Sequence, residues 1–251
     1  MGETVQGWNP ASALVTGASS GIGAALAIAL ATPGRTLHLG GRDESRLASV
    51  AERCRERGAA VDATTVDVRD RPALRRWIAG AAPDLLVANA GISGRGDAPD
   101  RSAELVEVNV TAVIESVEAA LPAMLGRGHG QLALMSSLAG YRGMPSAPVY
   151  CATKAAVRVY GDGLRAKLAR DGIAVSVICP GFVATPMTAP NPFPMPLLMS
   201  PERAAGIILR GLARRRAHIA FPLRLRWAAG LLALLPPWAS DPLLGRVPSK
   251  E

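Results

Sequence analysis

Short apolar runs alternate along the chain with longer segments whose apolar positions recur at helical spacing. "ASALVTG" precedes a helical "GIGAALAIALA", and "RTLHLGG" precedes a helical "DESRLASVAERCRERG". Further strands are predicted at "AAVDATTVDV", "PDLLVANAG", "GQLALMSS" and "GIAVSVICPG", with helices at about 101–125 and 149–170. This alternation is typical of βαβ units, and the apolar runs "DLLVA" and "AVSVI" indicate strands buried on both faces. The pattern predicts an α/β fold with a doubly wound parallel sheet of about seven strands and helices on both faces.

Two segments depart from this alternation. Residues 185–202, "TPMTAPNPFPMPLLMSPE", contain six prolines and three methionines, which is typical of a structured flap over an apolar pocket. The second segment, at 222–239, is apolar and fringed by arginines. Because α/β chains of 251 residues are routinely single domains, we expect a catalytic domain at 10–221 that includes a flap at 186–200. A C-terminal extension of the same domain would follow at 222–251.

The formal net charge of +8 is unevenly distributed along the chain. The last 51 residues, from Pro201 onward, contain nine lysines and arginines and three acidic residues, and so carry +6 of the total. No zinc-finger spacing or aromatic stacking platform accompanies these charges. The sequence therefore predicts no nucleic-acid partner.

The cysteines bear on redox compartment and metal binding. Cys54, Cys151 and Cys179 are widely spaced and form no C-x-x-C pair, which argues against a disulfide framework and against a metal site. The amino-terminal "MGETVQGWNP" has neither the basic start nor the apolar run of a signal peptide. No stretch reaches the roughly 18 uninterrupted apolar residues of a membrane-spanning helix. These observations predict a cytoplasmic protein without a bound metal.

The segment 222–239 has two interpretations. Its leucines and tryptophans, together with Arg224 and Arg226, suit a segment that lies as a peripheral contact on an anionic membrane, such as the inner face of a cell membrane. The same composition suits an amphipathic helix that packs on the core or on a second subunit. The sequence leaves both interpretations open.

The stretch "ALVTGASSGIG" also has two interpretations. Its glycines at 17, 21 and 23 suit a loop whose backbone approaches a dinucleotide pyrophosphate at a helix N-terminus. Residues 17–21 also match G-x-S-x-G, the nucleophile elbow of an α/β hydrolase, which needs an upstream strand and a histidine base. Only about a dozen residues precede the turn, and His38, His129 and His218 fall in structural contexts. We therefore predict a dinucleotide-binding loop of Rossmann type, with the hydrolase as the less favoured alternative.

Further motifs follow the glycine loop in a fixed order. They are T-G-x-x-x-G-x-G at Thr16–Gly23, "DV" at Asp67, "NAG" at Asn89–Gly91, "VNV" around Asn109, "SS" at Ser136 and Ser137, Y-x-x-x-K at Tyr150 and Lys154, and "PG" at Pro180 and Gly181. With this series the chain resembles the short-chain dehydrogenase/reductase family in its classical form, over about Ser12 to Ala205.

The Tyr–Lys pair can also be interpreted chemically. The i, i+4 spacing places Tyr150 and Lys154 on one helix face. Moving a hydride between a nicotinamide and a carbonyl carbon requires a proton for the oxygen, and a phenol with a pKa near 10 exchanges that proton poorly at neutral pH. We expect Lys154, with the positive nicotinamide ring, to lower the pKa of Tyr150, which then acts as acid and base.

The resemblance assigns the remaining catalytic residues. It implies that Ser137, 13 residues before Tyr150, bonds the substrate oxygen where negative charge develops. Ser136 is expected to point away in a supporting role. The resemblance further implies that Lys154 holds the nicotinamide ribose and that Asn109 anchors a water in the proton relay.

The cofactor is expected to lie along the glycine loop and the carboxyl ends of the following strands. Family resemblance places there Gly17, Ser19, Ser20, Gly21, Ile22, Gly23, Asp67, Val68, Asn89, Ala90, Gly91, Tyr150, Lys154, Pro180, Gly181, Val183 and Thr185. After the second strand, "LHLGGRD" offers Gly41 and then Arg42 where NAD enzymes commonly place an acid. Because an arginine binds a 2′-phosphate bidentately, we predict that NADP(H) is preferred over NAD(H).

These expectations define an oxidoreductase that uses NADP(H) and acts on a carbonyl or secondary alcohol. Relatives with an apolar tail often act on lipids, so the resemblance implies a hydrophobic substrate. The alternative is a cofactor-binding regulatory protein without turnover, against which the intact Ser137, Tyr150, Lys154 and Asn109 set argues. The resemblance also implies a homodimer or homotetramer, although the 18-residue interval from Gly91 to Asn109 predicts a trimmed helix at the usual dimer contact.

Overall fold

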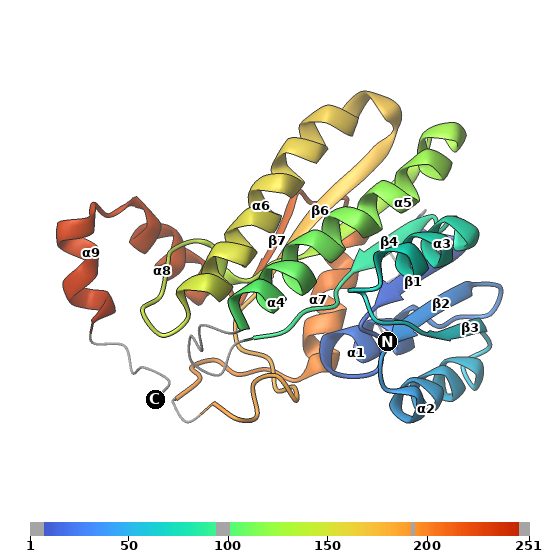
Figure 1. The fold of residues 1–251 in the computed structure, drawn as a ribbon, viewed down its shortest axis with the longest axis horizontal. Coiled ribbons are helices and arrows are strands. Elements are labelled where there is room, and N and C mark those ends of the chain that lie inside the picture. The colour runs from blue at the N-terminus through green and yellow to red at the C-terminus, as the bar shows by residue number, and fades with distance from the viewer. Residues whose placement is uncertain (1–7, 94–100, 192–193, 246–251) are drawn as a thin grey trace.

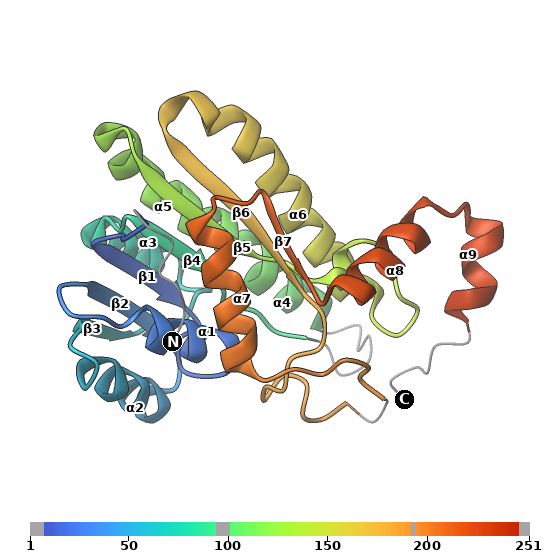
Figure 2. The same cartoon turned by 180° about the vertical axis from the view of Figure 1, so that it is seen from behind.

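A computed structural model describes residues 8–93, 101–191 and 194–245. Seven parallel strands form one sheet in the order β3-β2-β1-β4-β5-β6-β7, as Figures 1 and 2 show from opposite sides. Their bounds are β1 Ser12–Thr16, β2 Thr36–Gly41, β3 Ala60–Thr65, β4 Leu85–Ala88, β5 Gly130–Met135, β6 Ile173–Pro180 and β7 His218–Phe221. The sheet confirms the predicted α/β fold and its seven strands.

Helices cover both faces of the sheet (Figures 1 and 2). One face carries α1 (Gly21–Leu30), α2 (Glu44–Arg55) and α7 (Pro201–Ala213), whose apolar residues share one buried cluster. The other carries α3 (Arg71–Ala81), α4 (Ser102–Val106), α5 (Ala112–Arg127) and α6 (Pro148–Leu168). The helices predicted at about 101–125 and 149–170 are therefore present, the first with a π-helical turn at Glu107–Thr111 between α4 and α5.

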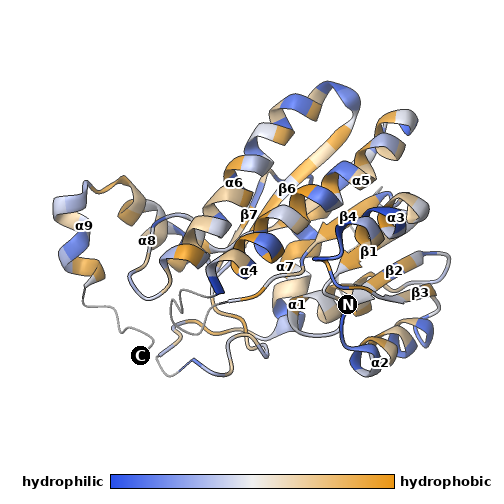
Figure 3. Ribbon diagram, in the orientation of Figure 1, coloured by the Kyte–Doolittle hydropathy of each residue, from blue (hydrophilic) through white to orange (hydrophobic). Residues whose placement is uncertain are grey.

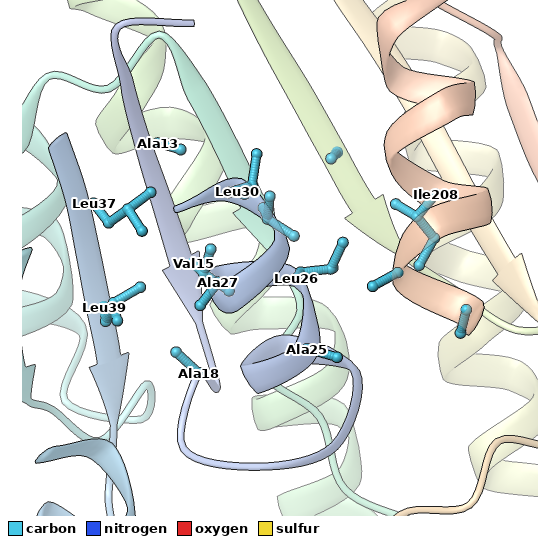
Figure 4. Packing of buried hydrophobic residues seen from close by; sticks show 14 of the residues in the cluster. Ala13, Val15, Ala18, Ala25, Leu26, Ala27, Leu30, Leu37, Leu39 and Ile208 are labelled. Atoms are coloured by element: carbon cyan, nitrogen blue, oxygen red, sulfur yellow. The ribbon is translucent and has the colours of Figure 1, made fainter. Parts of the chain in front are cut away.

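Alternation along β1 shows how the sheet separates two cores. Ala13 and Val15 belong to the cluster beneath α1 and α7, whereas Leu14 belongs to the cluster beneath α3, α5 and α6. Successive strand residues point to opposite faces, so a strand between two helical layers must be apolar throughout. Figure 3 shows this continuous hydrophobicity in the central strands, and Figure 4 shows Leu26 of α1 facing Ile208 of α7.

The chain connectivity creates a crevice at one edge of the sheet. β1 lies between β2 and β4, so successive crossovers leave it in opposite directions. Ligands of doubly wound folds bind beyond the carboxyl ends of the strands at such a reversal. The glycine loop, which follows β1, and Asn89, which follows β4, both lie at this edge.

One helix among the described residues, Ser102–Arg127, is long and apolar enough to cross a membrane by length and composition. Half of its apolar window is buried. Val113, Val117 and Met124 of this helix pack in the core against the sheet. Packing on the core thus accounts for its apolar composition.

The C-terminal extension folds as two helices, α8 (Leu223–Leu234) and α9 (Pro237–Leu244). They project from the body of the sheet beyond β7 (Figures 1 and 2). No residue of α8 is fully buried, and apolar side chains lie on both its inner and outer faces. Its inner apolar face packs beside β7 and the turn after β5, whereas its outer apolar face is exposed.

Candidate active site

A cleft of about 590 Å³ opens beyond the carboxyl ends of the central strands. Every residue predicted to bind cofactor lines it, as do Ser137, Tyr150 and Lys154. Asn109 does not line it. The start of the predicted flap also lines the cleft, at Pro186, Met187 and Thr188. Further lining residues that no sequence motif indicated are Asp43, Arg46, Val66, Ile92, Val108 and Met135. Most of these residues flank the predicted motifs by a few positions, so an extended window around each motif would have included them.

The glycine loop brings backbone to the cleft surface without side chains in the way. Gly17 and Gly21 have positive φ of 67° and 56°, a conformation that residues with a Cβ rarely adopt. At Gly23 a Cβ would lie 2.2 Å from the Gly17 carbonyl oxygen and 2.5 Å from Asn89 Nδ2. α1 starts at Gly21, and its N-cap residue Ser20 makes no side-chain capping bond. The first amides of α1 are thus available to an anion, which fits the pyrophosphate of a dinucleotide.

Hydrogen bonds tie the loop to the end of β4. Thr16 Oγ1 accepts from the backbone amides of Asn89 and Ala90, both at 3.0 Å. Asn89 Nδ2 in turn donates to the carbonyls of Thr16 at 2.9 Å and Gly17 at 3.2 Å. The two strands on either side of the topological reversal therefore share one hydrogen-bonded unit.

The nucleophile-elbow interpretation of residues 17–21 is wrong. His38 of β2 pairs with Asp62, His218 of β7 pairs with Asp162, and His129 lies in the turn before β5. None of the three lines the cleft. A serine at the elbow would have no histidine base among the described residues.

Helix α6 presents Tyr150 and Lys154 to the cleft on one face. The Lys154 Nζ lies 5.7 Å from the centroid of the Tyr150 ring. Ser137 follows β5, and its hydroxyl accepts from the Ala139 amide at 3.1 Å and lies within hydrogen-bonding reach of the Tyr150 phenol. The side chains of Ser137, Tyr150 and Lys154 therefore converge in the cleft. A substrate oxygen bound there could accept hydrogen bonds from the hydroxyls of Ser137 and Tyr150.

Lys154 is held almost entirely out of solvent. Its Nζ donates to the Met135 carbonyl at 3.1 Å, and burial lowers the pKa of its ammonium to about 8. Ser136 Oγ donates to the Lys154 backbone carbonyl at 2.6 Å. Ser136 thus supports the helix that carries Lys154, as predicted, although it also lines the cleft.

The protein's own groups do not lower the pKa of Tyr150 as predicted. Burial of the phenol raises its pKa to about 12, and the hydrogen bond with Ser137 opposes this rise only in part. The Lys154 ammonium lies over the Tyr150 ring, 5.7 Å from its centroid, and donates a hydrogen bond to the Met135 carbonyl, and the pKa of the phenol stays raised. The expected depression is therefore not a property of the folded chain alone.

Asn109 lies behind the cleft, fully buried within the π-helical turn. Its Oδ1 accepts from the Ile92 amide at 2.9 Å, and its Nδ2 donates to the Ile92 carbonyl at 2.9 Å and to Thr153 Oγ1 at 3.2 Å. A Cβ at Gly91 would lie 3.1 Å from Asn109 Oδ1 and 3.4 Å from Lys154 Nζ. Asn109 thus fixes the segment after β4 against α6.

Two arginines line the far end of the cleft beyond β2. Arg42 follows Gly41, and Arg46 stands one helical turn later in α2. Asp43 caps α2 by accepting from the Arg46 amide at 2.9 Å, and its other oxygen pairs with Arg46 Nε at 2.9 Å. Asp67, predicted near the adenine, is bound by Arg69 at 2.6 Å, which lowers the pKa of the Asp67 carboxyl.

Comparison with known proteins identifies the family. The short chain dehydrogenase family matches residues 11–193, so the chain belongs to the short-chain dehydrogenases/reductases. An uncharacterized oxidoreductase of Myxococcus xanthus is 36% identical over 90% of this chain and 92% of its own length. A putative ketoacyl reductase of granaticin polyketide synthesis in Streptomyces violaceoruber is 40% identical over 70% of this chain and 68% of its own.

Solved structures give the same answer for the fold. A short-chain dehydrogenase from Sphingobium yanoikuyae in complex with NADPH has a TM-score of 0.79 at 30% identity, over 96% of this chain and 97% of that one. A short-chain dehydrogenase from Mycobacterium paratuberculosis bound to NAD has a TM-score of 0.73 at 26% identity, over 83% and 94%. The protein is an NAD(P)-dependent oxidoreductase of the class that acts on CH–OH and C=O groups.

Proposed function

We propose that the protein transfers hydride between NADP(H) and a hydrophobic carbonyl or secondary alcohol, with Tyr150 as the proton donor and acceptor. The observation that carries this proposal is the convergence of Ser137, Tyr150 and Lys154 on one cleft whose other end offers an uncapped helix N-terminus and two arginines. The nicotinamide, when bound, supplies the hydride.

The chain's own residues supply the proton and hold the charge. Tyr150 gives its phenolic proton to the carbonyl oxygen during reduction and recovers it during oxidation. Ser137 donates a hydrogen bond to the same oxygen, where negative charge develops. Lys154, charged below its pKa of about 8, stabilises the phenolate across the helix face. Asn109 acts as a positioning residue, because its amide fixes the backbone that carries these groups.

The preference for NADP(H) rests on the two arginines at the end of β2. Arg42 and Arg46 both line the cleft there. A guanidinium binds phosphate through two parallel N–H bonds, and a 2′-phosphate in this part of the cleft could be bound by Arg42 before α2 and by Arg46 in its first turn. A carboxylate in this region that could bind ribose hydroxyls, Asp43, is already engaged with Arg46.

The flap gives the site its apolar character. Met187 lines the cleft, and Leu197 and Leu198 of the same flap are each more than 40% exposed. Val183 pairs with Met199 and closes the base of the flap proposed at 186–200. A flexible thioether such as Met187 adapts to bulky apolar groups. The three cysteines are buried and form no disulfide among the described residues, which supports a cytoplasmic enzyme.

The proposal is tested by following NADPH and NADH oxidation over a panel of hydrophobic aldehydes and ketones. Tyr150→Phe removes the hydroxyl and should reduce kcat by about 10²–10⁴-fold while cofactor still binds. Tyr160→Phe, on the same helix but outside the cleft, is the matched control and should retain full turnover. If the native protein binds cofactor yet turns over none of the panel, or if Tyr150→Phe remains active, the proposed reaction fails and a binding protein without turnover becomes the better description.

A further inference from the structure

One face of α8 is apolar and open to solvent. Leu223, Trp227, Leu231 and Leu234 are 63%, 67%, 64% and 83% exposed. At about 100° per residue these four positions fall within a sector of roughly 80° on the helix. They form one continuous strip, the outer stripe. Of the thirteen large apolar residues exposed in the described part of the chain, seven lie between Leu223 and Leu243.

The opposite face of α8 is also apolar and is already in use. Leu225, Ala229 and Leu232 are partly buried there. The Leu225 side chain packs against Gly181, where an added Cβ would lie 3.2 Å from Leu225 Cδ1. A helix with two opposite apolar faces normally has both of them covered. The inner face holds α8 to the catalytic domain, so the outer stripe needs a different partner.

Helix α9 adds exposed apolar side chains to those of α8. Ser240 and Leu244 are buried, which anchors α9, while Trp238 and Leu243 are 81% and 51% exposed. Arg142, in the loop between Ser137 and Tyr150, bonds to Ser240 Oγ, lies 3.4 Å from the Leu235 carbonyl and lies 3.9 Å from the Asp241 carboxylate. The two tail helices are therefore fixed to the loop that joins Ser137 to the helix of Tyr150 and Lys154.

The charges around the outer stripe have one sign. Arg224 and Arg226 flank the stripe on either side, and no acidic residue occurs between Pro222 and Ser240. The Arg226 guanidinium lies 5.8 Å from the Trp227 ring centroid. Asp241 is the nearest acid in sequence, and it faces Arg142. The run of arginines at 214–216 precedes β7 and so lies at the other end of that strand, away from α8.

We propose that α8 and α9 dock on an anionic membrane surface through the outer stripe. Leucines would enter the acyl region, Trp227 and Trp238 would lie at the boundary where indoles are favoured, and Arg224 and Arg226 would reach the headgroups. A second copy of the chain fits less well. A twofold contact through the stripe would bring the same two arginines together with no acid on either side.

Docking in this way would place the substrate cleft at the lipid surface. Gly181 lines the cleft and contacts Leu225, and Arg142 joins the tail to the loop before Tyr150. A hydrophobic ketone or alcohol dissolved in the membrane would then reach the flap without crossing water. This consequence rests on the proposed function, whereas the docking itself does not.

Vesicle sedimentation tests the docking without any substrate. The full chain with NADPH is mixed with vesicles of phosphatidylcholine, or of phosphatidylcholine with about one third phosphatidylserine. The native protein should pellet with the anionic vesicles, less so at high salt. Leu231→Gln with Leu234→Gln should weaken binding by about tenfold or more. Val159→Gln, which changes an equally exposed apolar residue on α6, should bind as the native protein does.

Further variants separate the possible outcomes. Arg224→Gln with Arg226→Gln should lose the preference for anionic over neutral vesicles. Tyr150→Phe should pellet like the native protein, so loss of turnover and loss of docking are distinguishable. The proposal is overturned if the native protein stays in the supernatant with anionic vesicles or if the stripe variant, shown by NADPH binding to be folded, still pellets. A stripe variant that instead reduces oligomer size in light scattering would assign the stripe to a second copy.

Discussion

The two ends of the cleft are built in opposite ways. At the nucleotide end, the glycine loop, the start of α1 and the Thr16–Asn89 bonds present mostly backbone, and the critical requirement is space. At the proposed catalytic end, buried polar side chains are held by carbonyl partners, and the pKa values of Tyr150 and Lys154 are displaced by burial. The comparison indicates that the first end is sensitive to volume and the second to charge.

The largest effect is expected where space is tightest. Gly23→Ala would place a Cβ 2.2 Å from the Gly17 carbonyl oxygen, so the loop must move away from β4. We expect loss of measurable NADPH binding and a free energy of unfolding lower by about 3 kcal/mol. Fluorescence titration and urea denaturation measure the two quantities.

Gly80→Ala is the control for this variant. Nothing lies within 4 Å of an added Cβ at Gly80 in α3. Alanine there should bind cofactor normally and be more stable by up to about 1 kcal/mol, because glycine disfavours a helix interior. If the Gly23→Ala and Gly80→Ala variants had the same NADPH affinity and the same free energy of unfolding, the space available at Gly23 would not explain its role.

Lys154 tests whether charge governs the other end. Burial lowers its pKa to about 8 from 10.5, so between those values the unfolded chain binds more protons and stability rises with pH. The cost of burying the ammonium is fully present below pH 8. Lys154→Met should therefore abolish most turnover yet stabilise the fold by roughly 1–3 kcal/mol at neutral pH.

The stability gain of Lys154→Met should shrink above pH 8 and vanish near 10.5, which denaturation at several pH values would show. Lys167→Met on the exposed face of the same helix should change little at any pH. If Lys154→Met destabilises the protein equally at all pH values, burial of the Lys154 ammonium does not lower the stability of the fold. The proposal that charge governs the catalytic end of the cleft is then weakened.

Two arginines at the nucleotide end, Arg42 and Arg46, supply the positive charge proposed to bind the 2′-phosphate of NADP(H). Arg42→Ala and Arg46→Ala should each weaken NADPH binding by about 10–100-fold, the effect of losing a charge-assisted hydrogen bond, and leave NADH binding nearly unchanged. Arg53→Ala, on α2 outside the cleft, is the control. Unchanged NADPH affinity in both variants would contradict the predicted cofactor preference.

A smaller effect is expected outside the cleft, where Glu115 of α5 pairs with Arg71 and Arg75 of α3. The hydrogen bond from Arg75 is the main cause of a lowered pKa at Glu115. A depressed carboxyl pKa stabilises the fold above the unfolded value, and this stabilisation is lost as pH falls through the folded value. Glu115→Gln should lower Tm by about 2–4 °C at pH 7 and by less near pH 3, without altering turnover.

Local patterns predicted much of the fold and of the site. The strands, the glycine loop and the i, i+4 pair of Tyr150 and Lys154 depend on residues close in sequence, and the structure brings them to one cleft. Ser136 makes the supporting bond expected of it, to the Lys154 carbonyl, but it lines the cleft as well instead of pointing away from it.

Features that depend on distant partners were missed. The Lys154 ammonium donates a hydrogen bond to the Met135 carbonyl. Asn109 Nδ2 donates hydrogen bonds to the Ile92 carbonyl and to Thr153 Oγ1. The raised pKa of Tyr150 likewise follows from burial, which no spacing of residues reveals. Arg46 was missed because it looks like an ordinary surface residue of α2 until Asp43 and the cleft are seen together.

The π-helical turn at Glu107–Thr111 makes the length of this segment critical. Such a turn holds one residue more than an α-helical turn. Deleting a single residue within it would let α4 and α5 join as one regular helix, with the register of α5 on the sheet kept. Side chains before and after the turn would keep their faces, because a π-helical turn takes up its extra residue locally, and the change would fall on the turn that holds Asn109. In a one-residue deletion scan through 107–111, the chain should still fold but lose turnover, because the site would no longer be correctly assembled. Substitution of side chains does not separate folding from site assembly in this way.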